Sequence, residues 1–202
     1  MSRLAGGFDN LYANDTSTVV TPYDGYVGYL YPYETSTVTV SGASVVYLHT
    51  YDTSTVAVSG ASVRDLSAYG TSTVAVSGAS VDYVDTYGTS SVDISGGRVD
   101  YVYTNETSTV DISGGSFYVL GAQDSSTVTL HGYDFQPTDG LSLDGNKVVG
   151  TGVLIGKWYD GTQWSISISV HDAGASILAI PEPAALALLA LGGLAVLRRP
   201  GK

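Results

Sequence analysis

The feature that most constrains this chain is a repeat of 18 residues, which is clearest from Thr53 to Gly70. There it reads Thr-Ser-Thr-Val-Ala-Val-Ser-Gly-Ala-Ser-Val-Arg-Asp-Leu-Ser-Ala-Tyr-Gly. An irregular copy of 19 residues precedes the regular ones, and the copies begin at Thr16, Thr35, Thr53, Thr71, Thr89, Thr107 and, in degenerate form, Ser125. A fixed period of this length is typical of proteins whose repeats stack on one another.

Each copy has apolar residues at positions 4, 6, 11 and 14, counted from its first Thr. Positions 4 and 6 share one face of a strand, and the β-branched residues there suit a pleated surface. The Gly at position 8, such as Gly60, is expected to end this strand and let the backbone bend. A second short strand should follow around positions 11 to 14, with a bend or bulge because the three-residue step breaks alternation.

One copy cannot bury four apolar side chains, but stacked copies can, because like residues then lie above like residues. Helical repeats need about 33 or more residues per unit, and this unit is shorter and rich in Val, Thr, Ser and Gly. The sequence therefore predicts an all-β fold, a single-stranded parallel β-solenoid (β-helix) over residues 1–136. Six to seven coils about 4.8 Å apart would form a rod about 30 Å long. The handedness stays open, because the apolar positions lack the period of six seen in left-handed triangular β-helices.

The register also extends backwards from Thr16, and it places Phe8 at position 11, Leu11 at position 14 and Asp15 at position 18. Met1 then falls inside a coil, and residues 1–5 contain no apolar segment of a secretory signal. We expect that upstream coils and a signal peptide are missing from this sequence. The alternative is a frayed cap over residues 1–15.

The period is not visible from Pro137 to Ile180, where we expect a cap over the open end of the stack. Lys147 to Tyr159 and Thr162 to Val170 are predicted to be two strands of a hairpin. Asp160-Gly161 between them is a strong turn signal.

The last residues, 181–202, consist of Pro181-Glu182-Pro183, an apolar segment over 184–197 and Arg198-Arg199 near the end. The apolar segment would form a helix of about 21 Å, shorter than the ~30 Å core of a bilayer. The three parts in this order resemble the PEP-CTERM sorting signal. The resemblance implies export, transient anchoring in the inner membrane, recognition by an exosortase and removal of the tail. It also implies a Gram-negative bacterium that makes extracellular polysaccharide. The repeats resemble Ser-Gly-Gly β-solenoid repeats of secreted proteins of this type.

Composition and motifs argue against several classes of function. The net charge is −11, which disfavours a nucleic-acid partner, and the absence of Cys excludes disulfides and thiol chemistry. His49, His131 and His171 lie in unlike contexts without metal-ligand spacing, and no phosphate loop or nucleophile elbow is present. We therefore expect no enzyme activity, catalytic residue, cofactor or metal. Acidic residues that could collect Ca²⁺ are expected to keep the rod soluble instead; they are Asp82, Asp85, Asp93, Asp100 and Asp111.

Two columns of hydroxyls should line the outward face of the first strand. Positions 1 and 3 alternate with the buried Val, so stacking places their side chains about 6.6 Å apart along the strand and about 4.8 Å apart between coils. This grid resembles the ice-binding face of β-solenoid antifreeze proteins, although Asp93 and Asp111 at position 5 would interrupt a flat plane. Exposed Thr also simply suits a strand. The candidate surface-binding residues are Thr35, Thr37, Thr53, Thr55, Thr71, Thr73, Thr107 and Thr109.

Tyrosine forms a further column at position 17, where stacked rings could contact sugar rings or stiffen the turn. The candidate glycan-stacking residues are Tyr33, Tyr51, Tyr69 and Tyr87. The sequence thus predicts an exported structural or adhesive protein of the cell surface or extracellular matrix, associated with polysaccharide. An ice- or crystal-surface binder and a carbohydrate-binding module are the alternatives.

Overall fold

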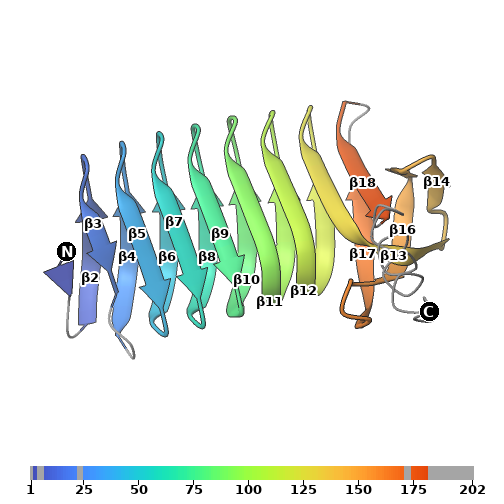
Figure 1. Ribbon diagram of the computed structural model, residues 1–202. Helices are drawn as coiled ribbons and strands as arrows, with labels where there is room; N and C mark the ends of the chain where they lie inside the picture. The colour runs from blue at the N-terminus through green and yellow to red at the C-terminus, as the bar shows by residue number, and fades with distance from the viewer. Residues whose placement is uncertain (1, 4–6, 22–24, 171–173, 182–202) are drawn as a thin grey trace, which may run out of the picture.

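The computed structural model of the chain describes residues 2–3, 7–21, 25–170 and 174–181. These residues form eighteen strands and no helix, and the strands join in one continuous sheet. The sheet winds as a stack of coils, with the first strands of the chain at one end of the rod and the last described strands at the other (Figure 1). The predicted β-solenoid of about 18 residues per coil is confirmed, and nothing in the described ranges is a helix long and apolar enough to cross a membrane. The apolar helix predicted at 184–197 lies outside the described residues.

Each coil contains two strand segments that run parallel to the same segments of the next coil. The first segments are β1 (Ser2–Arg3), β3 (Thr18–Val20), β5 (Thr37–Ser41), β7 (Thr55–Ser59) and β9 (Thr73–Ser77). The second segments are β2 (Gly7–Ala13), β4 (Tyr26–Pro32), β6 (Ser44–Thr50), β8 (Ser62–Ala68) and β10 (Ala79–Thr86). In the next coils the two segments merge into β11 (Ser91–Thr104) and β12 (Thr109–Ala122), and β13 (Thr127–Thr138) begins in the same way.

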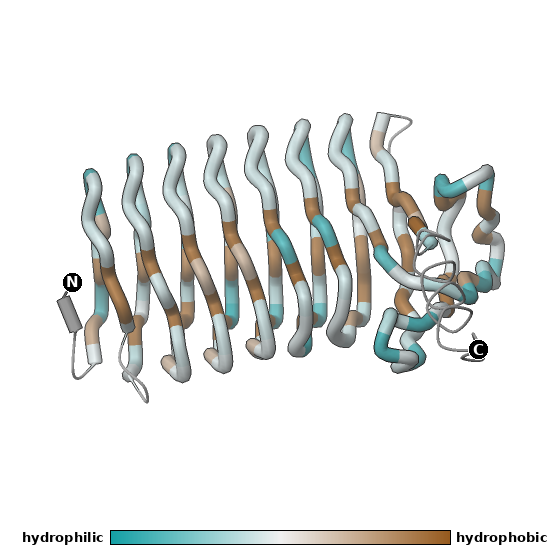
Figure 2. The backbone as a smooth tube through the Cα atoms, in the orientation of Figure 1, coloured by the Kyte–Doolittle hydropathy of each residue, from teal (hydrophilic) through white to brown (hydrophobic). Residues whose placement is uncertain are grey.

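The register places like residues beside like residues, as the repeat predicts. Val56 pairs with Val38 on one side and with Val74 on the other, and Val74 pairs in turn with Val92. At the N-terminal end Phe8 pairs with Val27, so residues 7–13 form part of a coil in the predicted register. Apolar bands therefore recur at matching heights on successive coils (Figure 2), and Val, Leu and Ile at positions 4, 6, 11 and 14 are buried from Val27 to Leu120.

The predicted break in the second segment is also present. Pairing between β10 and β11 passes from Val81↔Val99 directly to Tyr83↔Tyr101, so position 12 is skipped. The same position is skipped along the whole stack, because two apolar residues three apart can both face inward only if the chain bends between them.

Glycine permits the bend between the two segments, but at two different positions. In the earlier coils Gly42, Gly60 and Gly78 at position 8 have φ of 67°, 58° and 62°. In the later coils the strand does not end at position 8, and the left-handed residue is the next one, Gly97 with φ 95° and Gly115 with φ 103°. A Cβ atom on Gly97 would lie 2.2 Å from the carbonyl oxygen of Ala79, so only glycine fits there.

A closing segment, residues 133–181, ends the stack. β13 pairs antiparallel with β16 (Thr151–Lys157), and β14 (Ser142–Asp144) pairs antiparallel with β15 (Lys147–Val149). The strand predicted from Lys147 to Tyr159 is in fact two, because Gly150 between β15 and β16 has φ 97°. β16 and β17 (Gln163–Val170) form the expected hairpin, whose turn is held by the Thr162 N–H donating to Asp160 Oδ1 at 2.8 Å.

The closing segment then returns to the stack, which the sequence did not indicate. β17 pairs in parallel with β12, placing Ile168 beside Leu120. β18 (Ser176–Pro181) pairs in parallel with β13, placing Ile177 beside Val128. β17 and β18 therefore continue the same parallel ladders although their sequence no longer resembles the repeat.

Candidate functional surfaces

The hydroxyl face consists of the outward side chains at positions 1 and 3 of the first strand segments. Stacking places the position-3 residues in one column, with Thr55 between Thr37 and Thr73. All eight Thr residues predicted for this face are exposed: Thr35, Thr37, Thr53, Thr55, Thr71, Thr73, Thr107 and Thr109.

The two columns of this face differ in their hydrogen bonds. Position-1 hydroxyls donate to the backbone carbonyl 19 residues earlier, which belongs to the position-18 residue of the adjacent turn, as Thr53 Oγ1 does to Glu34 O at 2.9 Å and Thr107 Oγ1 to Gly88 O at 2.8 Å. The position-3 hydroxyls of Thr55 and Thr73 bond no other described residue. Position 1 therefore stabilises the turn, and position 3 is the column whose hydroxyls face solvent with their hydrogen-bonding groups unused by the fold.

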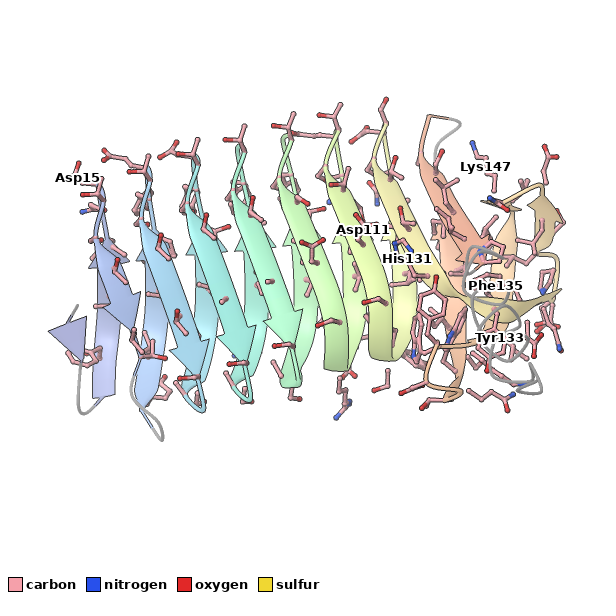
Figure 3. The ribbon with its side chains drawn as sticks, viewed as in Figure 1. Asp15, Asp111, His131, Tyr133, Phe135 and Lys147 are labelled. Atoms are coloured by element: carbon pink, nitrogen blue, oxygen red, sulfur yellow. The ribbon has the colours of Figure 1, made fainter. Side chains whose placement is uncertain are left out.

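Acidic residues form a third column, at the turn that precedes the hydroxyl face. Asp15, Glu34, Asp52, Glu106 and Asp124 occupy position 18 with φ between 54° and 59°, and Gly70 and Gly88 occupy it between them. From Glu34 onward, these carboxylates accept the backbone N–H of the same position one coil earlier. Asp52 Oδ2 accepts from Glu34 N at 3.2 Å, and Glu106 Oε2 accepts from Gly88 N at 2.6 Å. The side-chain hydrogen bond with Asp15 and the repulsion between the two carboxylates raise the pKa of Glu34. Figure 3 shows Asp15 at one end of the row of side chains along this edge.

A hollow of about 340 Å³ lies where the hydroxyl face meets the closing segment, and Asp93, Asp111 and His131 are among its lining residues. Asp111 Oδ1 lies 3.2 Å from His131 Nε2, and both residues are labelled in Figure 3. Burial, followed by repulsion from Asp111, raises the pKa of Asp93. Within the described ranges no three His, Cys, Asp or Glu side chains are grouped closely enough to hold a metal ion.

The tyrosine ladder is present as a continuous stack of rings. Centroids lie 4.8 Å apart for Tyr33 and Tyr51, 5.0 Å for Tyr51 and Tyr69, and 5.0 Å for Tyr69 and Tyr87, with planes within 9° of parallel. Each inner ring therefore has a neighbour against both of its faces. The edges and hydroxyls of the ladder remain available to a glycan, and the broad faces are used in stiffening the turn.

The structure also contains a column of buried hydroxyl groups, which the hydropathy of the sequence does not predict. Ser54, Ser72 and Ser90 at position 2 are fully buried, and Ser72 Oγ lies 2.8 Å from Thr50 Oγ1 at position 16 of another coil. Ser90 Oγ donates to the carbonyl of Ala68 at 3.1 Å. The sequence does contain a signal for this column, because every copy has Ser at position 2, between the outward-facing positions 1 and 3. Strand alternation places position 2 on the inner face.

The sorting residues lie at the end of the closing segment. Pro181 is the exposed last residue of β18 and pairs with Gly132, so the Pro-Glu-Pro motif begins directly on this strand. Glu182, Pro183, Arg198 and Arg199 lie outside the described residues.

Comparison with known proteins identifies this tail. Residues 179–202 match the PEP-CTERM protein-sorting motif, which confirms the resemblance seen in the sequence. No curated protein and no solved structure matches the chain. The motif implies export and sorting by a membrane-associated exosortase, which is the partner of the tail.

Proposed function

We propose that this chain, whose residues 179–202 match the PEP-CTERM protein-sorting motif, is a structural and adhesive rod of the cell surface or extracellular matrix of a Gram-negative bacterium. It is anchored transiently in the inner membrane, released from its tail and then held among extracellular polysaccharide. The observation that carries the proposal is a sorting motif attached to a rigid solenoid through the exposed end of its last strand.

The surface of the rod supports this role. Its outward Thr and Ser columns supply hydroxyl groups that bond water and sugar hydroxyls, and they also offer sites for glycosylation. The regular ladder of parallel strands resists bending because each coil is bonded along its length to both neighbours. A protein with these properties adds stiffness to a hydrated matrix and does not need a catalytic site.

Replacing Pro181, Glu182 and Pro183 together with Ala tests the sorting role. The full-length variant should remain unprocessed and membrane-associated, whereas a control with Arg64→Ala in the solenoid should be processed like the unaltered protein. Normal processing of the Pro-Glu-Pro variant would reject the sorting role. Co-sedimentation of the processed protein with extracellular polysaccharide from a producing strain tests the matrix role, and a protein left entirely in the supernatant would reject it.

A second candidate function is binding to ice or to another crystal surface. It is favoured by the column of exposed, unbonded hydroxyls at position 3, which includes Thr55 and Thr73. Asp93 and Asp111 interrupt the neighbouring column at position 5. Thermal hysteresis of the purified protein tests this function, and Thr73→Tyr should abolish most of it by lifting the surface off the crystal plane. An unaltered protein without thermal hysteresis would exclude the ice-binding role.

A further inference from the structure

The repeat changes at two successive positions in two neighbouring coils, and an open hollow of about 450 Å³ lies at the change. Position 10 is Ser in the other complete regular copies but Arg98 here, and position 11 changes from Val to Phe117 one coil later. Position 12, which varies along the stack, is Tyr118 in that same coil. The residues that line the hollow are Arg98, Asp100, Tyr101, Ser116, Phe117 and Tyr118. Its volume is within the range of sites that hold a small ligand.

Tyr118 differs from the tyrosines of the ladder in how its ring is presented. Tyr83 and Tyr101 stack with centroids 4.9 Å apart and planes within 10°, as in the ladder. Tyr118 approaches Tyr101 at 5.7 Å with an interplanar angle of 82°, so its plane runs along the rod. Its side chain is 64% exposed, the largest exposed fraction among the large apolar and aromatic residues that the structure describes. Tyr118 therefore offers a broad ring face, which the stacked tyrosines of the ladder do not.

Polar groups stand beside this ring. Arg98 Nε donates to Asp100 Oδ1 at 2.8 Å, and Arg98 Nη2 donates to Asp100 Oδ2 at 2.7 Å. The pair is charge-neutral and fixed in a bidentate geometry, with further N–H groups and carboxylate lone pairs left for a ligand. Asp82, one coil earlier at position 12, adds negative charge to this face, and the whole chain carries −11. An anionic ligand is therefore disfavoured, and a neutral ligand rich in hydroxyls is favoured.

The floor of the hollow is rigid because the closing segment supports it. Phe117 is buried and meets the Trp158 ring edge-on at 6.2 Å. The Trp158 indole N–H donates to the carbonyl of Gly115 at 2.7 Å, which ties the closing segment to this coil. The hollow is therefore held in shape before any ligand arrives, which lowers the cost of binding.

We infer that the hollow between Arg98 and Tyr118 is a binding subsite for a neutral hexopyranose unit of a polysaccharide. The C–H face of the sugar packs on the Tyr118 ring, and its hydroxyls bond the Arg98–Asp100 pair and Ser116. This inference rests on the proposed function and gives the polysaccharide a place on the rod, different from the tyrosine ladder.

Titration calorimetry of the processed protein with hexasaccharides of glucose, galactose and mannose tests the subsite, with hexagalacturonate as the anionic comparison. At least one neutral hexasaccharide should bind, and Tyr118→Ala should weaken it at least about tenfold. Tyr118→Phe, which keeps the ring, should stay within about threefold of the unaltered protein. The matched control is Tyr26→Ala, which removes another exposed tyrosine far from the hollow and should leave binding unchanged.

Several results would overturn the subsite. The subsite is wrong if no neutral hexasaccharide binds, or if hexagalacturonate binds more tightly than the neutral hexasaccharides. It is also wrong if Tyr118→Ala and Tyr26→Ala weaken binding equally, or if binding is lost only when Tyr51 and Tyr69 of the ladder are replaced. If Tyr118→Ala co-sediments with matrix polysaccharide as fully as the unaltered protein, the subsite is wrong while the proposed function stands. If the unaltered protein does not co-sediment, the proposed function fails.

Discussion

The regular stack from Thr37 to Ala122 and the closing segment from Tyr133 to Pro181 belong to one sheet but build their cores differently. In the stack a core side chain such as Val74 has another Val beside it in both neighbouring coils. In the closing segment Trp158 and Trp164 pack on each other with centroids 4.9 Å apart, and Phe135 lies 5.9 Å from Trp164. Repetition thus spreads stability over many equivalent contacts, whereas the end of the rod depends on a few large rings.

The largest effect is expected from a charge placed in the stack. Val74→Asp puts a carboxylate without a cation partner among fully buried side chains, which should lower the free energy of unfolding by more than about 4 kcal/mol. Thr73→Asp, the next residue on the exposed face, should change it by about 0.5 kcal/mol or less. Urea unfolding followed by circular dichroism measures both, and similar losses in the two variants would refute the assignment of inward and outward faces.

Removing a ring from the closing segment should have a large but local effect. Trp164→Ala leaves a cavity among the aromatic rings and should cost about 3–5 kcal/mol in that segment. Amide hydrogen exchange should quicken in β16 and β17 while β7 and β9 stay protected. Trp164→Phe is the milder control, because the buried indole N–H has no hydrogen-bond partner among the described residues. Uniformly faster exchange along the rod would contradict the contrast between the two regions.

Glycine should be required for different reasons at Gly156 in the closing segment and at Gly60 in the stack. A Cβ atom at Gly156 would lie 2.4 Å from Cζ2 of Trp164, so Gly156→Ala forces the ring to move and should cost about 1–3 kcal/mol. At Gly60 no atom lies within 4 Å of such a Cβ, but φ is 58°, so Gly60→Ala should cost about 1 kcal/mol from backbone strain alone. Replacement by Asn separates the two causes, because Asn tolerates the left-handed conformation. Gly60→Asn should cost less than Gly60→Ala, and Gly156→Asn at least as much as Gly156→Ala.

The smallest effect is a pH dependence that arises in the stack. Burial, followed by repulsion from Asp65, raises the pKa of Asp85 to about 6. The folded state then binds more protons than the unfolded chain between about pH 4 and pH 6, so the free energy of unfolding falls as pH rises through this window. Asp85 is partly exposed, and after allowance for solvent screening the loss at neutral pH should be about 1 kcal/mol.

Asp85→Asn should remove this loss and raise Tm by about 2–4 °C at pH 7 while changing little at pH 4. Asp160 in the closing segment provides the opposite case, because its hydrogen bonds with Thr162 lower its pKa. Its stabilising contribution is present above the unfolded pKa and is lost as pH falls through the folded one. A pH profile of Tm that Asp85→Asn leaves unaltered would refute the assignment.

The stack could be predicted residue by residue because its amino-acid sequence is periodic. Val56 beside Val74 follows from the 18-residue spacing alone, and so does the outward direction of Thr55 and Thr73. The buried hydroxyl of Ser72 was not predicted, because polarity suggested an exposed residue although strand alternation placed it inside. The carboxylate column at position 18 was also missed, because the positive φ of Asp15 and Glu34 and the bond from the Asp15 backbone N–H to the Glu34 carboxylate follow from the geometry of stacked turns.

The sequence by itself determined the coil length, the all-β fold, the columns of inward-facing side chains and the sorting motif of this protein. Each of these follows from the 18-residue period or from a contiguous motif. Only the tertiary structure decided that β17 and β18 rejoin the stack, and that Arg98, Phe117 and Tyr118 meet in one hollow. The strands β17 and β18 have no periodic signal in the sequence. The 18-residue register does place Arg98 beside Ser116 and Val99 beside Phe117, but the packing of Trp158 against Phe117 joins residues far apart in the sequence, and such a contact exists only once the chain is folded.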